Sequence, residues 1–156
     1  MIFRPYDPVQ DRPAVHHLWQ EIHWIDREAK EDTRYMDIFL GASKTLITEV
    51  NGAAECLVSS APGSILHLEN EHSMAAVVAV TTSLVARKQG LASRLTAQLI
   101  AEDAAQGFST SALGMFEQGY YSRLGFGTGP YEHKVGFNPA RLNVAVKAAV
   151  PLRLTE

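Results

Sequence analysis

A charged, glycine-containing segment, Arg87-Lys88-Gln89-Gly90-Leu91-Ala92, stands between a run of small and β-branched residues and a periodic helical segment. When a strand passes into a helix through a glycine turn, the first backbone N–H groups of the helix lack intrahelical acceptors and point outward. The helix dipole adds about half a positive charge there, and Arg87 and Lys88 add cationic side chains. Gly90 leaves room for a ligand oxygen because it has no Cβ. The segment therefore predicts a phosphate or pyrophosphate site, the alternative being a simple turn with solvated basic residues.

The spacing of this segment narrows the kind of ligand. It matches neither the GxxxxGK[ST] loop that binds nucleoside triphosphates nor the GxGxxG fingerprint that binds dinucleotides. A different phosphate-bearing ligand is therefore expected.

Three histidines, His16, His17 and His23, fall in one helical segment and suggest a metal site. His16 and His23 are seven residues apart and so near one face, but they lack the i, i+4 geometry of a helical metal pair. No acidic third ligand is set by spacing, so we expect surface histidines and no metal. Cys56 is the single cysteine, which excludes an internal disulfide framework and a zinc site built on several cysteines.

Length and composition indicate one globular domain over residues 1–156. The chain is 46% hydrophobic and 20% charged, close to the average of globular proteins. Its net charge of -3 gives no overall basic surface, so nucleic acid is not an expected partner. The N-terminal residues lack the apolar core of a signal peptide, and no apolar run reaches the roughly 18 residues of a membrane span. We therefore expect a soluble, cytoplasmic protein with no membrane partner.

Hydrophobic periodicity predicts a sheet flanked by helices. Helices are expected at 13–25, 33–40 and 91–107, with a short one at 117–124, and strands at 2–6, 44–50, 53–60, 74–82, 108–116 and 131–137. Asn51-Gly52 predicts a type I′ hairpin turn, and Pro62-Gly63 predicts another turn. Residues 74–116 form a βαβ unit after an antiparallel hairpin. The predicted fold class is α/β, with a central mixed sheet flanked by helices.

The order of these motifs is similar to that of a known family. A buried strand, R-x-x-G-x-A, an amphipathic helix, a further strand and then YYSRLGF at Tyr120 to Phe126 resemble the GCN5-related N-acetyltransferase (GNAT) family, closely over residues 74–137. The segment FEQGYYSRLGFGTG also resembles the Eis-type acetyltransferases. Eis-type chains are far longer and use their own C-terminal carboxylate as base, so their oligomeric state and substrate range are not carried over.

The resemblance implies acetyl-CoA as the co-substrate. The backbone of Val80, Thr81 and Thr82 would pair with the pantetheine arm, whose amides can bind an exposed strand edge. The pyrophosphate would lie on Lys88, Gln89, Gly90, Leu91, Ala92 and Ser93, with Arg87 at the rim. Phe116 and Glu117 match the cofactor-side pair of the Eis-type segment.

The resemblance also implies catalytic residues. Tyr121 matches the tyrosine that donates a proton to the leaving thiolate, which a phenol with a pKa of about 10 can do. The alternative is that Tyr120 and Tyr121 are packing residues. Many members place a glutamate inside the central strand, but Ala76 stands there in this chain. Glu71 and His72 are candidate bases acting through water, unless they belong to a solvated strand entrance or no dedicated base exists.

The acceptor is expected to be a primary amine of a small molecule or peptide. In the family, the connection between the first two helices often lines the acceptor pocket, which makes Trp24, Asp26 and Glu28 candidates. Two other classes stay open: a non-catalytic acyl-CoA-binding sensor with this fold, and an interaction or structural protein in which the glycine turn is only a turn. A homodimer could form if residues after Pro139 make an edge strand.

Overall fold

The computed structural model describes residues 1–26, 28, 30–114, 119–129, 134–141 and 143 of the 156-residue chain. The chain divides into two units, Met1–Phe126 and Gly127–Glu156, which are described separately. In the second unit, the described residues include one short 3-10 helix, η3, at Pro139–Arg141. The prediction of one domain over residues 1–156 and that of a dimer through the tail stay predictions.

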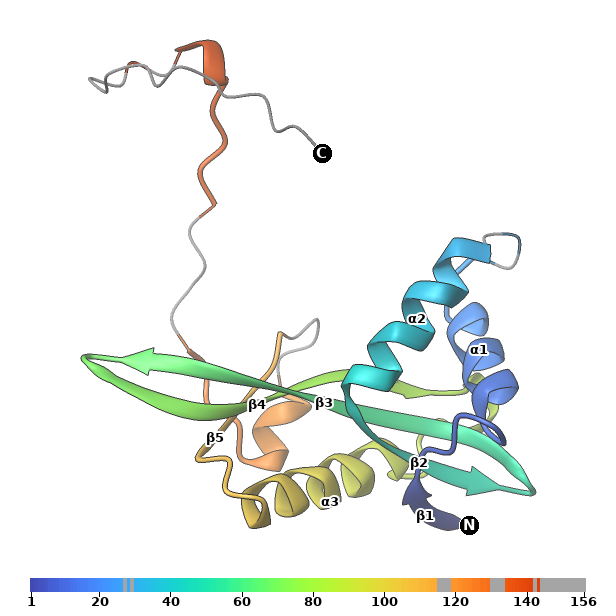
Figure 1. The fold of residues 1–156 in the computed structure, drawn as a ribbon. Helices are drawn as coiled ribbons and strands as arrows, with labels where there is room; N and C mark the ends of the chain where they lie inside the picture. The colour runs from blue at the N-terminus through green and yellow to red at the C-terminus, as the bar shows by residue number, and fades with distance from the viewer. Residues whose placement is uncertain (27, 29, 115–118, 130–133, 142, 144–156) are drawn as a thin grey trace, which may run out of the picture. The chain divides into compact units, whose positions relative to one another are not determined.

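A five-stranded mixed sheet forms the centre of the first unit (Figure 1). Its strands are β1 (Ile2–Pro5), β2 (Lys44–Val50), β3 (Ala53–His67), β4 (Asn70–Thr82) and β5 (Thr110–Ala112), in spatial order of their numbering. Neighbouring strands are antiparallel except β4 and β5, which are parallel. The predicted mixed sheet and βαβ unit are therefore confirmed.

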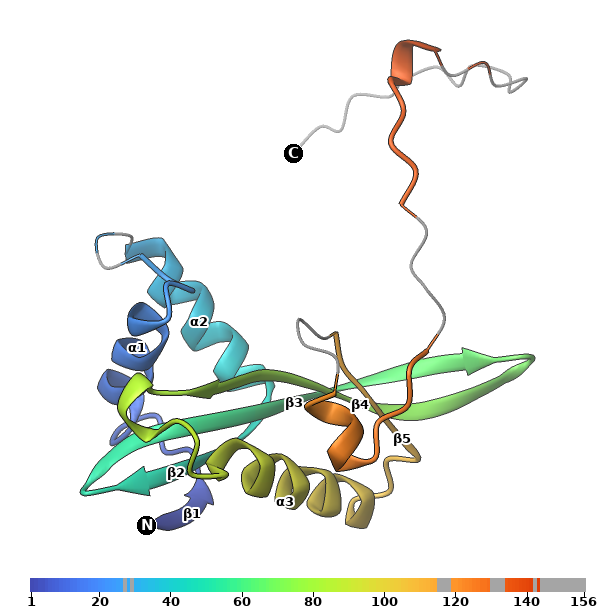
Figure 2. The same cartoon turned by 180° about the vertical axis from the view of Figure 1, so that it is seen from behind.

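Three α-helices cover the two faces of this sheet (Figures 1 and 2). On one face lie α1 (Arg12–Glu21) and α2 (Lys30–Ala42), and on the other lies α3 (Leu91–Ala105). Successive side chains of β2 point to opposite faces of the sheet. Ile47 therefore packs in the core beneath α1 and α2, and its neighbour Leu46 packs in the core beneath α3. The α3 stripe of Leu91, Leu95 and Leu99 is at most 1% exposed, which fixes the helix on the sheet.

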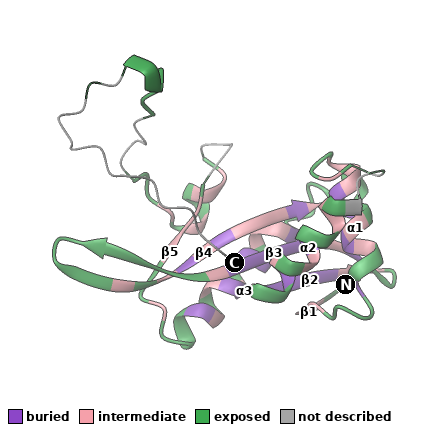
Figure 3. Ribbon diagram, turned by 45° about the horizontal axis from the view of Figure 1, so that its top comes forward, coloured by how far each residue is buried: buried purple, intermediate pink, exposed green. Residues whose placement is uncertain are grey.

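Of the two turns predicted from the sequence, the structure contains one. Asn51 and Gly52 have φ values of 51° and 83°, as the type I′ turn requires. The predicted turn at Pro62-Gly63 is wrong, because β3 continues through these residues to His67 and pairs with β4 throughout. The far part of this hairpin is exposed, whereas the part beneath the helices is buried (Figure 3).

The predictions after residue 107 hold in part. The extended segment at 108–116 contains only the short strand β5, and residues 115 and 116 lie outside the described part. The short helix is the 3-10 helix η2 (Tyr121–Leu124), which ends at Gly125 with φ 91°. Of the strand predicted at 131–137, residues 131–133 lie outside the described part, and residues 134–137 form no strand.

Candidate active site

The N-terminus of α3 presents backbone N–H groups without acceptors. The first hydrogen bond of the helix runs from Arg94 N to Gly90 O at 3.1 Å. The N–H groups of Leu91, Ala92 and Ser93 have no acceptor among the described residues, and the first turn carries no acidic side chain. The dipole of a 15-residue helix ends at this point with its positive pole. These groups together form a site for an anion.

The loop before α3 has the backbone conformation that such a site needs. Lys88 and Gly90 have left-handed φ values of 64° and 73°, and a turn of this kind directs successive N–H groups into one concavity. A Cβ at Gly90 would meet no protein atom within 4 Å, so the space beside it is open. The glycine therefore leaves room for a ligand rather than for a packed neighbour.

The connection from β4 to this loop is held by hydrogen bonds on both sides. Ser83 N donates to Glu55 O at 2.9 Å, which extends the β3 pairing past the end of β4. Leu84 N donates to the carboxylate of Glu21 at 2.8 Å, which ties the 3-10 helix η1 (Leu84–Ala86) to the end of α1. The loop thus starts from a fixed point.

β4 has an open edge beside this loop. Its parallel pairing with β5 covers Met74 to Ala76 only, and β4 then continues to Thr82 without a strand partner on that side among the described residues. This part of β4 contains a β-bulge, because the register between β4 and β3 shifts between the pairs Leu57–Thr81 and Ser59–Val78. Ala79, at this bulge, has a φ of 54°, which is unusual for a residue with a Cβ. The exposed backbone groups here can accept an added, strand-like ligand.

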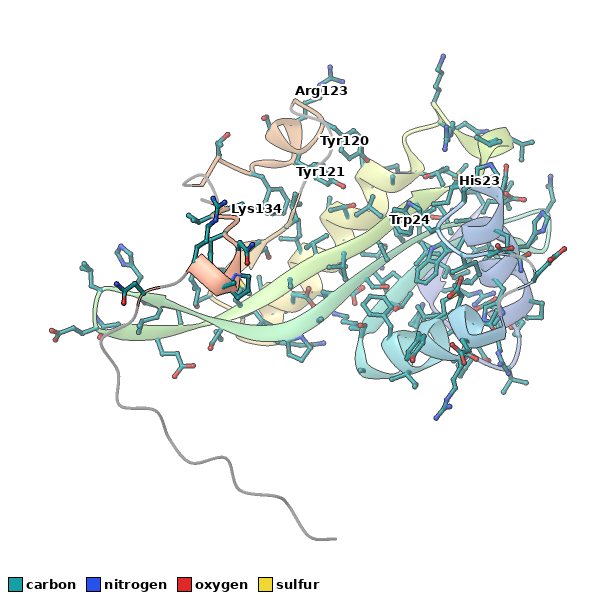
Figure 4. All side chains as sticks on the ribbon, turned by 90° about the horizontal axis from the view of Figure 1, so that it is seen from above. His23, Trp24, Tyr120, Tyr121, Arg123 and Lys134 are labelled. Atoms are coloured by element: carbon teal, nitrogen blue, oxygen red, sulfur yellow. The ribbon has the colours of Figure 1, made fainter. Side chains whose placement is uncertain are left out.

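A cleft of about 820 Å³ joins the open edge to the anion site. One wall is made by the end of β4 and the start of α3, and the facing wall by Tyr120, Tyr121 and Arg123 of the η2 region. Trp24, which follows α1, also belongs to the lining. In Figure 4, Tyr120, Tyr121 and Arg123 lie together, apart from His23 and Trp24.

The described side chains that line the cleft carry positive charge only. They include Arg87, Lys88 and Arg123, but no aspartate, glutamate or histidine. With the N-terminus of α3, this lining suits a ligand with several negative charges.

The two tyrosines of the cleft have different surroundings. Tyr120 Oη accepts a hydrogen bond from Ser93 Oγ at 3.1 Å, which ties η2 to the first turn of α3. Tyr121 lies edge-on to Tyr120 and to Phe126, with ring centroids 4.9 Å and 6.0 Å away. Partial burial, and to a smaller degree Tyr120, raise the pKa of Tyr121 above its usual value. Tyr121 therefore keeps its proton at neutral pH and can donate it.

Most residues expected to bind the cofactor line this cleft. They are Val80, Thr81, Thr82, Arg87, Lys88, Gly90, Leu91, Ala92 and Ser93. Gln89 belongs to the same loop but not to the lining, and Phe116 and Glu117 lie outside the described residues. Sequence reasoning did not assign Tyr120 or Arg123 to the site, although both stand within the quoted YYSRLGF segment.

The candidate bases lie elsewhere. Glu71 and His72 pair with Leu66 and Ile65 near the tip of the long hairpin. His72 is eight residues from Val80 along β4, about 25 Å at the rise of a strand. Neither residue is brought to the cleft.

A second cavity, of about 500 Å³, lies between α1, α2 and β4. Trp24 lines both this cavity and the cleft, and Ala79 of the β4 bulge forms part of its wall. Asp26 and Glu28 are exposed and line neither space: Asp26 N donates to Asp32 Oδ2 at 3.1 Å, and Glu28 N donates to Asp26 Oδ1 at 3.0 Å. Of the three expected acceptor residues, the structure therefore brings only Trp24 to the cavities.

Cys56 and His16 each contact a neighbouring polar side chain. Cys56 is fully buried and accepts a hydrogen bond from Thr82 Oγ1 at 3.3 Å, and burial raises the pKa of its thiol to about 11. His16 Nε2 lies 2.9 Å from Asp37 Oδ1. Within the described residues, no three histidine, cysteine or acidic side chains gather as metal ligands would. In the same part of the chain, every helix is too short or too polar for a bilayer crossing.

Comparison with known proteins gives one family match. A family model described as acetyltransferase (GNAT) domain matches residues 9–129. No curated protein matches the chain. The match to the family model covers β2 to β5, the three α-helices and the residues that line both cavities.

Solved structures share the fold at low sequence identity. A conserved protein of unknown function from Enterococcus faecalis V583, described as a probable N-acyltransferase, has a TM-score of 0.72 at 15% identity over 80% of this chain and 31% of its own. A predicted acetyltransferase from Clostridium acetobutylicum, solved with acetyl-CoA, has a TM-score of 0.68 at 16% identity over 86% and 95%. Glucosamine-6-phosphate N-acetyltransferase from Arabidopsis thaliana has a TM-score of 0.69 at 14% identity over 88% and 98%. The chain thus spans about a third of the first protein and nearly all of the other two, and the predicted fold class is confirmed.

Proposed function

The chain belongs to the GNAT family of acetyltransferases, and from this premise we propose that it transfers an acetyl group from acetyl-CoA directly to a primary amine of a small molecule or peptide. The single observation that carries the proposal is the continuous cleft from the open edge of β4 to the bare N-terminus of α3. A strand-like pantetheine arm and a pyrophosphate need these two features side by side.

The residues of the cleft fit acetyl-CoA. The N–H groups of Leu91, Ala92 and Ser93 would bind the pyrophosphate beside the space that Gly90 leaves open. Arg87, Lys88 and Arg123 would balance its charge and that of the remaining phosphate. The open edge of β4 between Val80 and Thr82 would bind the pantetheine amides.

Tyr121 is the proposed general acid. Bound acetyl-CoA supplies an activated thioester. As the amine nitrogen forms a bond to the carbonyl carbon and the C–S bond breaks, Tyr121 Oη would give its proton to the leaving sulfur and then recover a proton from solvent. The place of Tyr121 in the lining of the cleft supports this role, and its pKa, raised from an already high usual value, is consistent with a protonated phenol at neutral pH.

The proposed mechanism uses no built-in base at the cleft. Its described lining residues carry no carboxylate or imidazole, and Ala76 stands where many relatives of this family have a glutamate. The amine would therefore lose its proton to water before or during attack. The Eis-type likeness around Tyr121 stays a prediction, and it does not extend to a base.

The lack of a carboxylate in the cleft also favours one rival function, an acyl-CoA-binding sensor without catalysis. Such a protein needs the anion site and the open edge but neither a base nor an acceptor cavity. The cavity beside the β4 bulge therefore supports the enzyme over the sensor.

The test is release of the CoA thiol from acetyl-CoA in the presence of a panel of polyamines, amino acids, aminoglycosides and peptide N-termini, with the acetylated product identified by mass spectrometry. The proposal predicts release that depends on one class of amine. Binding of acetyl-CoA without release for any amine would favour the sensor, and absence of binding would exclude both functions.

A further inference from the structure

The cavity between α1, α2 and β4 is lined by aromatic rings and one carboxylate. Trp19, Trp24, Tyr35 and Phe39 supply the rings, and Asp32 supplies the charge. The remaining described lining residues are apolar, and none of them is basic. Aromatic faces and a carboxylate both attract a cation, whereas the apolar walls favour a carbon skeleton.

The aromatic wall is held in a fixed position relative to the cleft. Trp19 is 6% exposed, and its Nε1 donates to Thr81 Oγ1 at 3.2 Å. Its ring lies 5.8 Å from that of Trp24 and 6.1 Å from that of Phe39, centroid to centroid. Because Thr81 lines the cleft, this hydrogen bond links the aromatic wall of the cavity to the proposed pantetheine edge.

The cavity has an inner end and an outer end. Ala79, next to Val80 of the open edge, lies at the sheet. Helix α2 stands with its C-terminal end at the sheet and its N-terminal end away from it (Figure 1), and Asp32 is in the first turn of α2. Seven residues separate Asp32 from Phe39, about 10 Å along a helix. A molecule in the cavity therefore meets the cofactor edge at one end and the carboxylate at the other.

Asp32 is positioned rather than free to turn away. Its Oδ2 accepts a hydrogen bond from Asp26 N at 3.1 Å, across the connection between α1 and α2. A carboxylate has further acceptor positions on both oxygens. Tyr35 is three residues after Asp32 on α2 and therefore belongs to the same outer end of the cavity. It is 67% exposed and offers a ring face to a cation.

We propose that the acceptor is a primary amine with an apolar body and a second, cationic group at its far end. The reacting amine lies at Ala79 beside the thioester, the apolar body lies between Trp19, Trp24 and Phe39, and the second cation lies at Asp32 and Tyr35. This inference rests on the proposed acetyl transfer, of which it names the substrate class.

The test compares three amines that share one aromatic body and differ at the far end: p-xylylenediamine, p-methylbenzylamine and p-(aminomethyl)benzoate. Their kcat/KM values are measured with saturating acetyl-CoA. Beyond the factor of about two for its two equivalent amines, the diamine is expected to exceed the methyl compound about tenfold, and the carboxylate is expected to be the poorest. A preference of this kind requires a negative, aromatic outer end.

Variants then test which residues cause the preference for the diamine. Asp32→Asn should bring the diamine to within about threefold of the methyl compound, since it removes the charge that would attract the second cation. Tyr35→Leu should reduce the preference by a smaller factor, since it keeps the apolar surface but not the ring. Asp37→Asn is the matched control, a carboxylate of the same helix that does not line this cavity, and it should keep the preference.

Equal kcat/KM for the three amines, or a preference that survives Asp32→Asn, would overturn the inference and leave the proposed acetyl transfer intact. No acetylation of any of the three would also overturn the inference. Whether the proposed function falls with it is then decided by the wider amine panel, which tests acetyl transfer without assuming this cavity.

Discussion

Trp24 lies with its ring centroid 5.8 Å from that of Trp19, at the point where α1 ends in a left-handed turn. His23 has a φ of 61°, its N–H donates to Gln20 O at 3.2 Å, and Trp24 N donates to Trp19 O at 2.9 Å. This pair of bonds is the Schellman motif, in which an apolar contact joins the residue after the turn to the last full turn of the helix. The motif holds Trp24 where the cleft and the aromatic cavity meet.

His23→Gly should stabilise the protein by about 0.5 to 1 kcal/mol, because glycine adopts this left-handed conformation without the strain that a Cβ brings, less its entropy cost in the unfolded chain. Urea unfolding followed by tryptophan fluorescence measures the change. His23→Ala keeps the Cβ and is the control, which should show no such gain. A loss of stability in the glycine variant would mean that the imidazole itself holds the turn.

Tyr121→Phe should lower kcat by about 10² to 10⁴ with little change in acetyl-CoA affinity, because it removes only the proton donor. Tyr120→Phe is the matched control: it loses the hydrogen bond from Ser93 but keeps the ring, and its kcat should stay within about fivefold of the parent. Equal effects of the two substitutions would contradict the general-acid assignment.

The pH profile gives a second check on Tyr121. Because burial and Tyr120 raise the pKa of its phenol, the protonated, donating form persists above the usual value of 10.0. The rate of the parent protein should therefore fall only at still higher pH, and that fall should be absent from the residual rate of Tyr121→Phe. If the rate of the parent protein instead began to fall at a pH well below 10, another group would be responsible for the fall.

Acid should unfold the protein partly through Asp11. This carboxylate is 3% exposed and accepts bonds from Arg4 Nη1 at 2.6 Å, Arg4 Nη2 at 2.7 Å and Asp7 N at 2.8 Å. Burial acts to raise its pKa, but the bonds from Arg4 and Asp7 and the charge of Arg4 outweigh burial and lower it below 3.8. A folded-state pKa below the unfolded one stabilises the fold above the unfolded pKa, and this contribution is lost as the pH falls through the folded pKa.

Asp11→Asn should accordingly cost about 2 to 4 kcal/mol of unfolding free energy near neutral pH, and less as the pH is lowered below about 4. Denaturant unfolding across this pH range measures the difference. Asp37→Asn, which breaks a pair with the more exposed Arg12, should cost at most about 1 kcal/mol. A cost for Asp11→Asn that does not depend on pH would show that packing, not charge, is responsible.

The sequence predicts most elements of the fold because their signals are local. Periodicity identifies the three helices, and Asn51-Gly52 has the conformations its residue types favour. Pro62-Gly63 misleads because a Pro-Gly pair also fits an edge position. β2 pairs with β3 only up to Ser60, so at Pro62 one side of β3 has no strand partner among the described residues and no N–H donor is needed there. That condition depends on where another strand ends, which the local sequence does not contain.

The candidate site also has features that the sequence predicts and features that it does not. The glycine loop and the YYSRLGF segment have recognisable spacing, so most of the residues that line the cleft are predictable, although Tyr120 and Arg123 are not assigned to it from the sequence. The bulge at Ala79 is not, because alanine has no preference for a left-handed φ and the sheet imposes it. The role of Asp32 is also hidden, since a carboxylate in the first turn of a helix ordinarily serves the helix dipole. Only the packing of α2 against α1 and β4 brings it to a cavity.

Gly90 offers the most direct test of the central claim, that the cleft at the N-terminus of α3 binds acetyl-CoA. Gly90 and Gly52 both have positive φ, 73° and 83°, and a Cβ at either would meet no protein atom within 4 Å. Alanine at either position should thus cost the fold a similar amount, about 1 kcal/mol. Only the Cβ at position 90 would occupy ligand space.

Calorimetric titration with acetyl-CoA should give micromolar binding for the parent protein, similar binding for Gly52→Ala, and affinity weaker by about tenfold or more for Gly90→Ala. Equal loss of affinity in both variants would show that the effect comes through stability. Unchanged affinity in Gly90→Ala, or no binding by the parent protein, would contradict the assignment of this cleft as the acetyl-CoA site.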